Sequence, residues 1–124
     1  MSALRGIVIL QLATQLAMGV LGFAFQAEAL FPDLRAIDLL VFRLAAWANL
    51  AAAGLGAWLV AARDPRLLRA VAVSELVYHT LAAWEGASRA WIAPVPELVE
   101  LCAGAASFHG VWVVLLIVGL RTSA

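Results

Sequence analysis

Apolar residues fill four long segments of the chain, separated by short connections that contain proline or charged residues. Each segment exceeds the roughly 20 residues that a helix needs to cross the hydrocarbon core of a bilayer. Short connections make sequential helices antiparallel neighbours. The pattern therefore predicts an all-α integral membrane protein, an up-down-up-down four-helix bundle in which residues 1–124 form one domain. We expect its helices at about residues 6–31, 38–62, 66–91 and 97–121.

Composition agrees with a membrane protein. Of the 124 residues, 65% are hydrophobic, and the mean hydropathy is +0.99, whereas a soluble domain is about half apolar. The formal net charge is zero, which gives no sign of a nucleic-acid partner. All eight basic residues are Arg, and together with the heavy use of Ala this is typical of a GC-rich genome. We expect a multi-pass protein of a bacterial inner (plasma) membrane.

Charged residues divide between the two ends of the predicted bundle. One end, with both termini and the second connection, carries Arg5, Arg63, Arg66, Arg69 and Arg121. The other end carries Glu28, Asp33, Asp38, Glu85, Glu97 and Glu100, with Arg35, Arg43 and Arg89 among them. Because Arg-rich connections stay on the cytoplasmic side, this distribution predicts that both termini are cytoplasmic.

The third helix carries a stripe of polar side chains on one face: Glu75, Tyr78, His79, Glu85 and Arg89. An ionisable side chain near the bilayer centre costs about 2.5–3.5 kcal/mol, so such residues face inward or serve a function. Glu75 and His79 are one turn apart near mid-membrane, which suits proton transfer. A structural hydrogen-bonded pair is the alternative. Glu85 and Arg89 repeat the spacing at the outer end, where an ordinary ion pair is expected.

The other helices add polar residues that are expected to line a cavity open to the outer leaflet. On the first helix they form an amide-lined face, for which hydrogen bonding between helices is the alternative. On the second helix, Arg43 either pairs with Glu85 or Glu100 or extends outward to the membrane surface. The residues expected to bind a substrate are Gln11, Gln15, Met18, Trp47, Asn49, Glu100 and Ser107.

Two residues of the fourth helix lie off its polar stripe. A single histidine such as His109 on an apolar helix is most simply a structural residue, and Cys102 has no second cysteine with which to form a disulfide. Convergence of Glu75, His79 and His109 on a metal is conceivable, but no HxxxH, ExxH or CxxC spacing is present. We therefore expect no metal and no cofactor.

Several stretches resemble the small four-helix DoxX-like bacterial membrane proteins. They run from Phe42-Arg43-Leu44-Ala45-Ala46-Trp47 through Gly54-Leu55-Gly56 to Arg63-Asp64-Pro65-Arg66. In the third helix, Glu75-Leu76-Val77-Tyr78-His79 is similar to a helix of that group that contains Tyr and His. The resemblance covers about half of the chain. It implies the four-helix fold and assigns no catalytic residue.

Paired carboxylates beside a histidine and a tyrosine favour an enzyme that needs only proton transfers. Isomerisation, cyclisation and epoxide opening by a hydrolase are such reactions, and the substrate would be a lipophilic small molecule that enters from the lipid. One carboxyl group would act as general acid, while Arg43 would keep another ionised as a base. The residues expected to carry out catalysis are Arg43, Glu75, Tyr78, His79 and Glu85.

Two other functions stay open. A proton-coupled transporter or channel subunit would use the same intramembrane acids, and because four helices are few for a full pathway it predicts a homodimer. A structural or accessory membrane protein would bind a partner through faces of small residues, such as Ala52 and Gly56. In all three cases the surroundings are membrane lipids.

Overall fold

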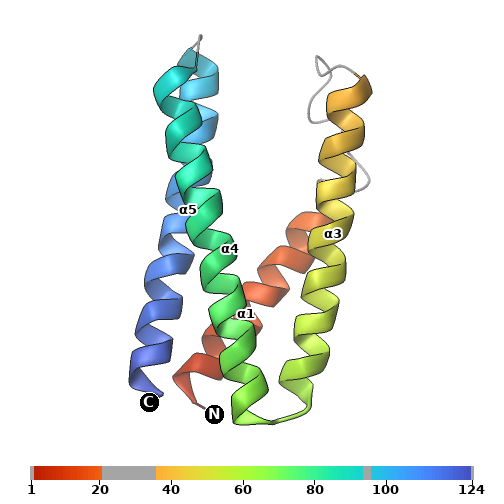
Figure 1. The fold of residues 1–124 in the computed structure, drawn as a ribbon, viewed down its shortest axis with the longest axis vertical. Helices are drawn as coiled ribbons and strands as arrows, with labels where there is room; N and C mark the ends of the chain where they lie inside the picture. The colour runs from red at the N-terminus through yellow and green to blue at the C-terminus, as the bar shows by residue number, and fades with distance from the viewer. Residues whose placement is uncertain (1, 21–35, 94–95, 124) are drawn as a thin grey trace. The chain divides into compact units, whose positions relative to one another are not determined.

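The computed structural model describes residues 2–20, 36–93 and 96–123, and the described part consists of helices and short connections, with no strand. Figure 1 shows four helices: α1 (Ala3–Met18), α3 (Ala36–Ala61), α4 (Pro65–Ile92) and α5 (Pro96–Thr122). The predicted all-α class with four helices is confirmed, and the bounds of the last three helices agree within two residues. The predicted first helix is described as α1 and a π-helical turn at residues 19–20. Its remainder, residues 21–31, lies outside the described residues.

The prolines begin the helices that the sequence predicted. After α3, Arg63 adopts a left-handed conformation with φ of 60°, and its amide donates to the carbonyl of Val60 at 3.2 Å. This conformation costs a non-glycine residue roughly 1–2 kcal/mol and reverses the chain. Pro65 is then the first residue of α4 and Pro96 the first of α5, the position where a missing N–H costs nothing.

The chain divides into two compact units. One contains residues 1–8 with Pro65–Ala124, and the other contains Ile9–Asp64. In the first unit, α4 and α5 pack against each other as an antiparallel pair. The N-terminal residues join this pair where α5 ends, because a Cβ added to Gly119 would lie 3.0 Å from Cδ1 of Ile7 and 3.1 Å from Cδ1 of Leu4. In the second unit, Gly19 packs closely against the side chain of Leu50.

Helices α4 and α5 come into backbone contact at Gly86. A Cβ at this position would lie 3.0 Å from the backbone nitrogen of Ala106 and 3.0 Å from the carbonyl oxygen of Cys102. Those atoms belong to the backbone, so they cannot move aside as a flexible side chain does. Glycine therefore permits the two helices to approach at this level, as small residues do in membrane helix pairs.

Large apolar side chains are exposed and several polar ones are buried. Trp91 is 90% exposed and Trp84 is 73% exposed, whereas Gln11, Glu75 and His79 are 0%, 7% and 1% exposed. A water-soluble protein rarely exposes so much apolar surface. Two segments, Arg43–Ala61 and Pro96–Thr122, are long and apolar enough to cross a membrane.

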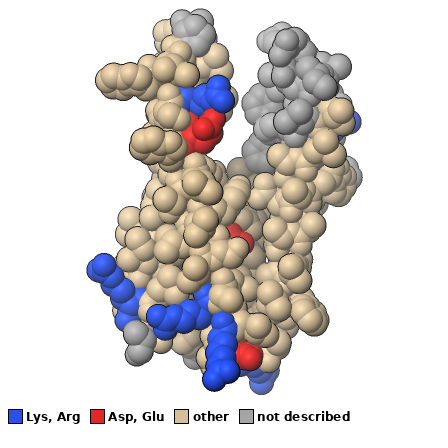
Figure 2. Space-filling view, in the orientation of Figure 1, with Lys and Arg blue, Asp and Glu red and all other residues tan. Residues whose placement is uncertain are grey.

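Three basic side chains of the first unit lie at one end. Arg66 and Arg69 lie in the first turns of α4, and Arg121 lies in the last turn of α5. Because the two helices are antiparallel, these residues lie at the same end, while Glu85 and Arg89 lie near the other. Figure 2 shows basic side chains in blue at the lower end of the view. Within this unit, the basic residues therefore group as the sequence predicted.

Candidate functional site

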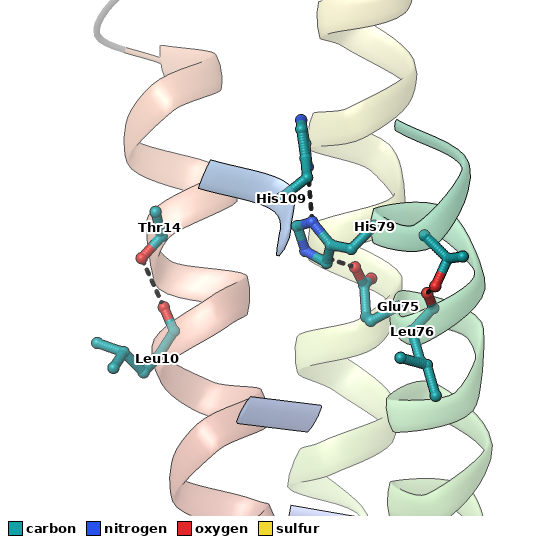
Figure 3. A network of polar contacts seen from close by, with 7 residues as sticks. Leu10, Thr14, Glu75, Leu76, His79 and His109 are labelled. Carbon is teal, nitrogen blue, oxygen red and sulfur yellow. Dashed lines mark hydrogen bonds and ion pairs between the residues drawn. The ribbon is translucent and has the colours of Figure 1, made fainter. Parts of the chain in front are cut away.

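Two histidines on α4 and α5 form the centre of the site. His79 lies 13 residues before the last residue of α4, and His109 lies 13 residues after the first residue of α5. In an antiparallel pair, this places them at the same level. The Nδ1 atoms of the two rings are 2.7 Å apart, a hydrogen-bond distance (Figure 3). One ring must donate an N–H and the other must accept it through a lone pair.

Glu75 adds a carboxylate on the other side of His79. It precedes His79 by one helical turn, and its Oε2 lies 4.0 Å from Nε2 of His79. This distance exceeds that of a direct hydrogen bond, so contact requires a shift of about 1 Å or one bridging water. The side chains of His79 and Glu75 are 1% and 10% exposed. We call Glu75, His79 and His109, in this order, the relay.

Aromatic rings enclose the two imidazoles. The Tyr78 ring meets both edge-on, with centroids 5.0 Å from His79 and 5.6 Å from His109. Trp112 stacks on His79 at 6.0 Å, and Phe108 meets His109 edge-on at 5.3 Å. Such contacts hold the ring planes in place and exclude water from their faces. The geometry of the hydrogen bond between the histidines is thereby fixed from both helices.

The relay can pass a proton between the two rings as they stand, and on to Glu75 after the shift of about 1 Å or through the bridging water described above. A neutral imidazole carries one N–H and one lone pair on opposite edges, so it can accept a proton at one nitrogen and release another at the second. A buried charge is costly unless it is paired. The relay suits general acid–base chemistry, because the carboxylate and the two rings can share a proton among them.

The outer pair on α4 differs from the relay. Nε of Arg89 donates to Oε1 of Glu85 at 2.7 Å, and the two side chains are 65% and 60% exposed. The hydroxyl of Ser88 donates to the backbone carbonyl of Glu85 at 2.9 Å. The ion pair expected from the spacing is present. The catalytic role expected for Glu85 stays a prediction.

The remaining predicted residues of the first unit lie on α4 and α5. Tyr78 contacts both histidines, as described above. Glu100 and Ser107 of α5 are exposed, and the Ser107 hydroxyl donates to the carbonyl of Ala103 at 2.8 Å. Their predicted part in binding a substrate stays a prediction.

The other predicted site residues belong to the unit of Ile9–Asp64. On α1, Gln11 is fully buried, Gln15 is half-buried and Met18 is 44% exposed. On α3, Arg43 is half-buried and Trp47 is 47% exposed. There, the amide nitrogen of Asn49 donates to the carbonyl of Ala45 at 3.0 Å. Burial of Gln11 agrees with an inward-facing amide on α1.

Sequence reasoning considered His109 beside His79 only as a metal ligand and did not include it among the site residues. It placed His109 off the polar stripe of its own helix. That position did not indicate the contact of His109 with α4, because Nδ1 of His109 is hydrogen-bonded to Nδ1 of His79. One signal in the sequence could have indicated this pairing: the two histidines lie equally far from the proline-containing connection between α4 and α5. Trp112, which stacks on His79, was not among the predicted site residues.

The side chains that commonly bind metals do not gather into a site in the described part of the chain. Within 2–20, 36–93 and 96–123, no group of three or more His, Cys, Asp or Glu side chains is arranged to hold a metal ion. Cys102 is a half-buried free thiol. The expectation that the protein uses no cofactor stays a prediction.

Comparison with models of known families, with curated proteins and with solved structures gives no match. The resemblance to DoxX-like proteins therefore stays a prediction. The chemistry of the site has to be argued from the residues themselves.

Proposed function

We propose that the chain is a small integral membrane protein in which the relay catalyses an acid–base reaction on a lipophilic small molecule. Isomerisation, cyclisation and epoxide opening are the reaction types that fit. The observation that carries this proposal is the 2.7 Å bond between Nδ1 of His79 and Nδ1 of His109. It joins two helices at a part-buried point, and the carboxylate of Glu75 lies 4.0 Å from the other nitrogen of His79.

Membrane insertion of all four helices, with both termini cytoplasmic, is part of the proposal. The apolar spans of α3 and α5 support it, as do exposed side chains such as Trp91 and Trp84. Trp residues are common at the membrane interface. The grouping of Arg66, Arg69 and Arg121 at one end of α4 and α5 favours the stated orientation.

A local reaction fits the relay better than proton transport across the membrane. From Glu75 to His79 the relay covers about 6 Å along α4, a fifth of the roughly 30 Å hydrocarbon core. The hydroxyl of Thr80 next to it donates to the carbonyl of Leu76 on its own helix at 2.7 Å. Ser107 is bonded to its own helix in the same way. These hydroxyls do not extend the relay towards either surface.

The surroundings of the relay suit an apolar substrate. Tyr78 is 38% exposed and Phe108 is 40% exposed, and both contact His109. A lipophilic molecule lying against these rings would place a carbonyl, hydroxyl or epoxide oxygen near an imidazole. The histidine would then take a proton from a carbon next to a carbonyl, or give one to an opening epoxide while water attacks the other carbon.

The test compares three full-length proteins expressed in the same cells: wild type, His79→Gln and Thr80→Val. Thr80 is the next residue and its hydroxyl bonds only within α4 among the contacts described, so it is the matched control. Lipid extracts are compared by mass spectrometry. We expect a pair of molecules of equal mass, or differing by one water, whose ratio shifts in His79→Gln and not in Thr80→Val.

Purified protein then has to reproduce the conversion of that pair in detergent, where no gradient exists. Turnover by wild type and Thr80→Val, and its loss in His79→Gln, supports an enzyme. Extracts that do not differ between wild type and His79→Gln would overturn the proposal. Proton flux in proteoliposomes without turnover in detergent would also overturn it, in favour of transport.

A further inference from the structure

The protons of the relay can be arranged in two ways that give every hydrogen bond one donor and one acceptor. In the first, Glu75 is ionised and accepts the Nε2 proton of His79, once a shift of about 1 Å or one bridging water closes the 4.0 Å between them. Nδ1 of His79 then has only a lone pair, so it accepts the Nδ1 proton of His109 across the 2.7 Å bond. Nε2 of His109 is left without a proton. Both histidines are neutral, and the relay carries the single negative charge of Glu75.

The second arrangement reverses every bond. A protonated Glu75 donates to Nε2 of His79 by way of the same shift or bridging water, and the Nδ1 proton of His79 is donated to Nδ1 of His109. Nε2 of His109 then carries a proton. Both histidines are again neutral, and the relay as a whole is uncharged. The two arrangements differ by one proton, although the proton that enters is not the one that reaches Glu75.

We propose that the relay is a proton wire that exchanges protons with the substrate at Nε2 of His109 and stores one on Glu75. A proton leaves its bond to the substrate and forms an N–H bond at Nε2 of His109. The Nδ1 proton of His109 moves to Nδ1 of His79. The Nε2 proton of His79 moves to Oε2 of Glu75 after a shift of about 1 Å, or it moves to one bridging water that gives another proton to Oε2. Each atom that loses a bond to hydrogen does so as the next one forms it. The part played by the substrate rests on the proposed function.

The exposure of the three side chains indicates which end of the wire a substrate can reach. His79 is 1% exposed and Glu75 is 7% exposed, whereas His109 is half-buried. In an imidazole, Nε2 lies on the edge away from Nδ1, so the bond to His79 leaves Nε2 of His109 directed away from the relay (Figure 3). A substrate therefore reaches the wire at His109. His109 is the catalytic residue, and His79 and Glu75 are positioning residues that act through it.

The wire also avoids a buried cation. If His109 kept the incoming proton, the site would hold an imidazolium ion among Tyr78, Phe108 and Trp112, which is costly away from water. Passing the charge to Glu75 neutralises the carboxylate instead. In the contacts described for α4 and α5, Tyr78 is the further titratable side chain that touches the two rings. Its phenol keeps the same proton in both arrangements.

The wire can be tested without a substrate. The chain contains two histidines, so nitrogen NMR of full-length protein labelled at His and placed in lipid bilayers gives four ring signals. In wild type, acidification should move the proton of His109 from Nδ1 to Nε2 and that of His79 from Nε2 to Nδ1. Both changes should have the same midpoint pH. Neither ring should become doubly protonated at a pH above that midpoint.

Three variants separate the wire from a structural role. Glu75→Gln cannot store a proton and should lose the joint change, whereas Glu75→Asp should restore it and Thr80→Val should keep it. If the histidines titrate independently, or if Glu75→Gln behaves as wild type, the wire is wrong. This outcome is separate from failure of the proposed function, because a joint change without any turnover would retain the wire and remove the enzyme.

Discussion

Helix α4 carries two acid–base pairs with identical spacing and opposite surroundings. Glu85 and Arg89 are 60% and 65% exposed and bond directly at 2.7 Å. Glu75 and His79 are 10% and 1% exposed, 4.0 Å apart, and joined to a third group, His109, on the neighbouring helix. The spacing alone therefore does not distinguish a surface ion pair from a candidate site. Burial and a partner on another helix do.

The two pairs also differ in what holds them. The outer pair is open to its surroundings, so solvent and salt weaken its attraction, and such pairs contribute little to stability. In the inner pair, removing one member leaves the other buried without this partner, and an unsatisfied buried polar group costs about 1–3 kcal/mol. The inner pair is therefore costly to maintain, as ionisable groups at a functional site commonly are.

The largest expected difference is in turnover. We expect His79→Gln to lower the rate of the proposed reaction by roughly 10²–10⁴-fold, the usual contribution of general acid–base catalysis. Arg89→Gln removes the basic member of the outer pair in the same way and should leave the rate within about twofold, because this pair is exposed and no described contact joins it to the relay. Rates are measured in detergent on the molecules identified from lipid extracts. Equal losses in both variants would mean that the two pairs do not differ in function.

A second expected difference is in stability. Trp112 is 7% exposed and stacks on His79, so Trp112→Ala should lower the free energy of unfolding by about 3–5 kcal/mol. Trp91, near the outer pair, is 90% exposed, and Trp91→Ala should change it by less than about 0.5 kcal/mol. Unfolding in detergent, followed by circular dichroism, measures both. Similar losses would show that the outer end is packed as tightly as the inner one.

The smallest expected effect concerns salt. Raising the salt concentration from about 0.1 M to 1 M shortens the Debye length from about 10 Å to 3 Å. The coupling between Glu85 and Arg89, measured by a double-mutant cycle, should fall under this change. The coupling between Glu75 and His79 should not, because buried pairs are screened much less. If both couplings fell together, the inner pair would be reached by solvent ions, contrary to its burial.

The helices could be predicted because their signals are local. Apolar length, the proline at the start of α4 and the proline at the start of α5 act within single segments, and the observed bounds follow them closely. The backbone contact at Gly86 could not be predicted in the same way. Whether a glycine faces a neighbouring helix depends on the rotation of both helices about their axes, and Gly104, on α5, has nothing within 4 Å of an added Cβ.

The site could be predicted only in part, for the same reason. The pairing of Glu75 with His79 follows from spacing within one helix. The bond from His79 to His109 depends on how α4 and α5 face each other, and a helical projection of each sequence does not contain that information. The matching distances of the two histidines from the connection fix their level along the helices. They do not fix whether the rings point towards each other.

The contact at Gly86 has a consequence for how finely the histidines can be adjusted. Gly86 follows His79 by seven residues, and Cys102 precedes His109 by seven, so the contact lies two turns from the bond between the rings. At Gly86 the separation of the helices is set by main-chain atoms, which every amino acid shares. The separation of α4 and α5 at His79 therefore depends on this contact, and a substitution of Gly86 can only increase it. A methyl group added at Gly86 would push the two helices apart. It would lengthen the distance between the two Nδ1 atoms, which proton transfer requires to be short.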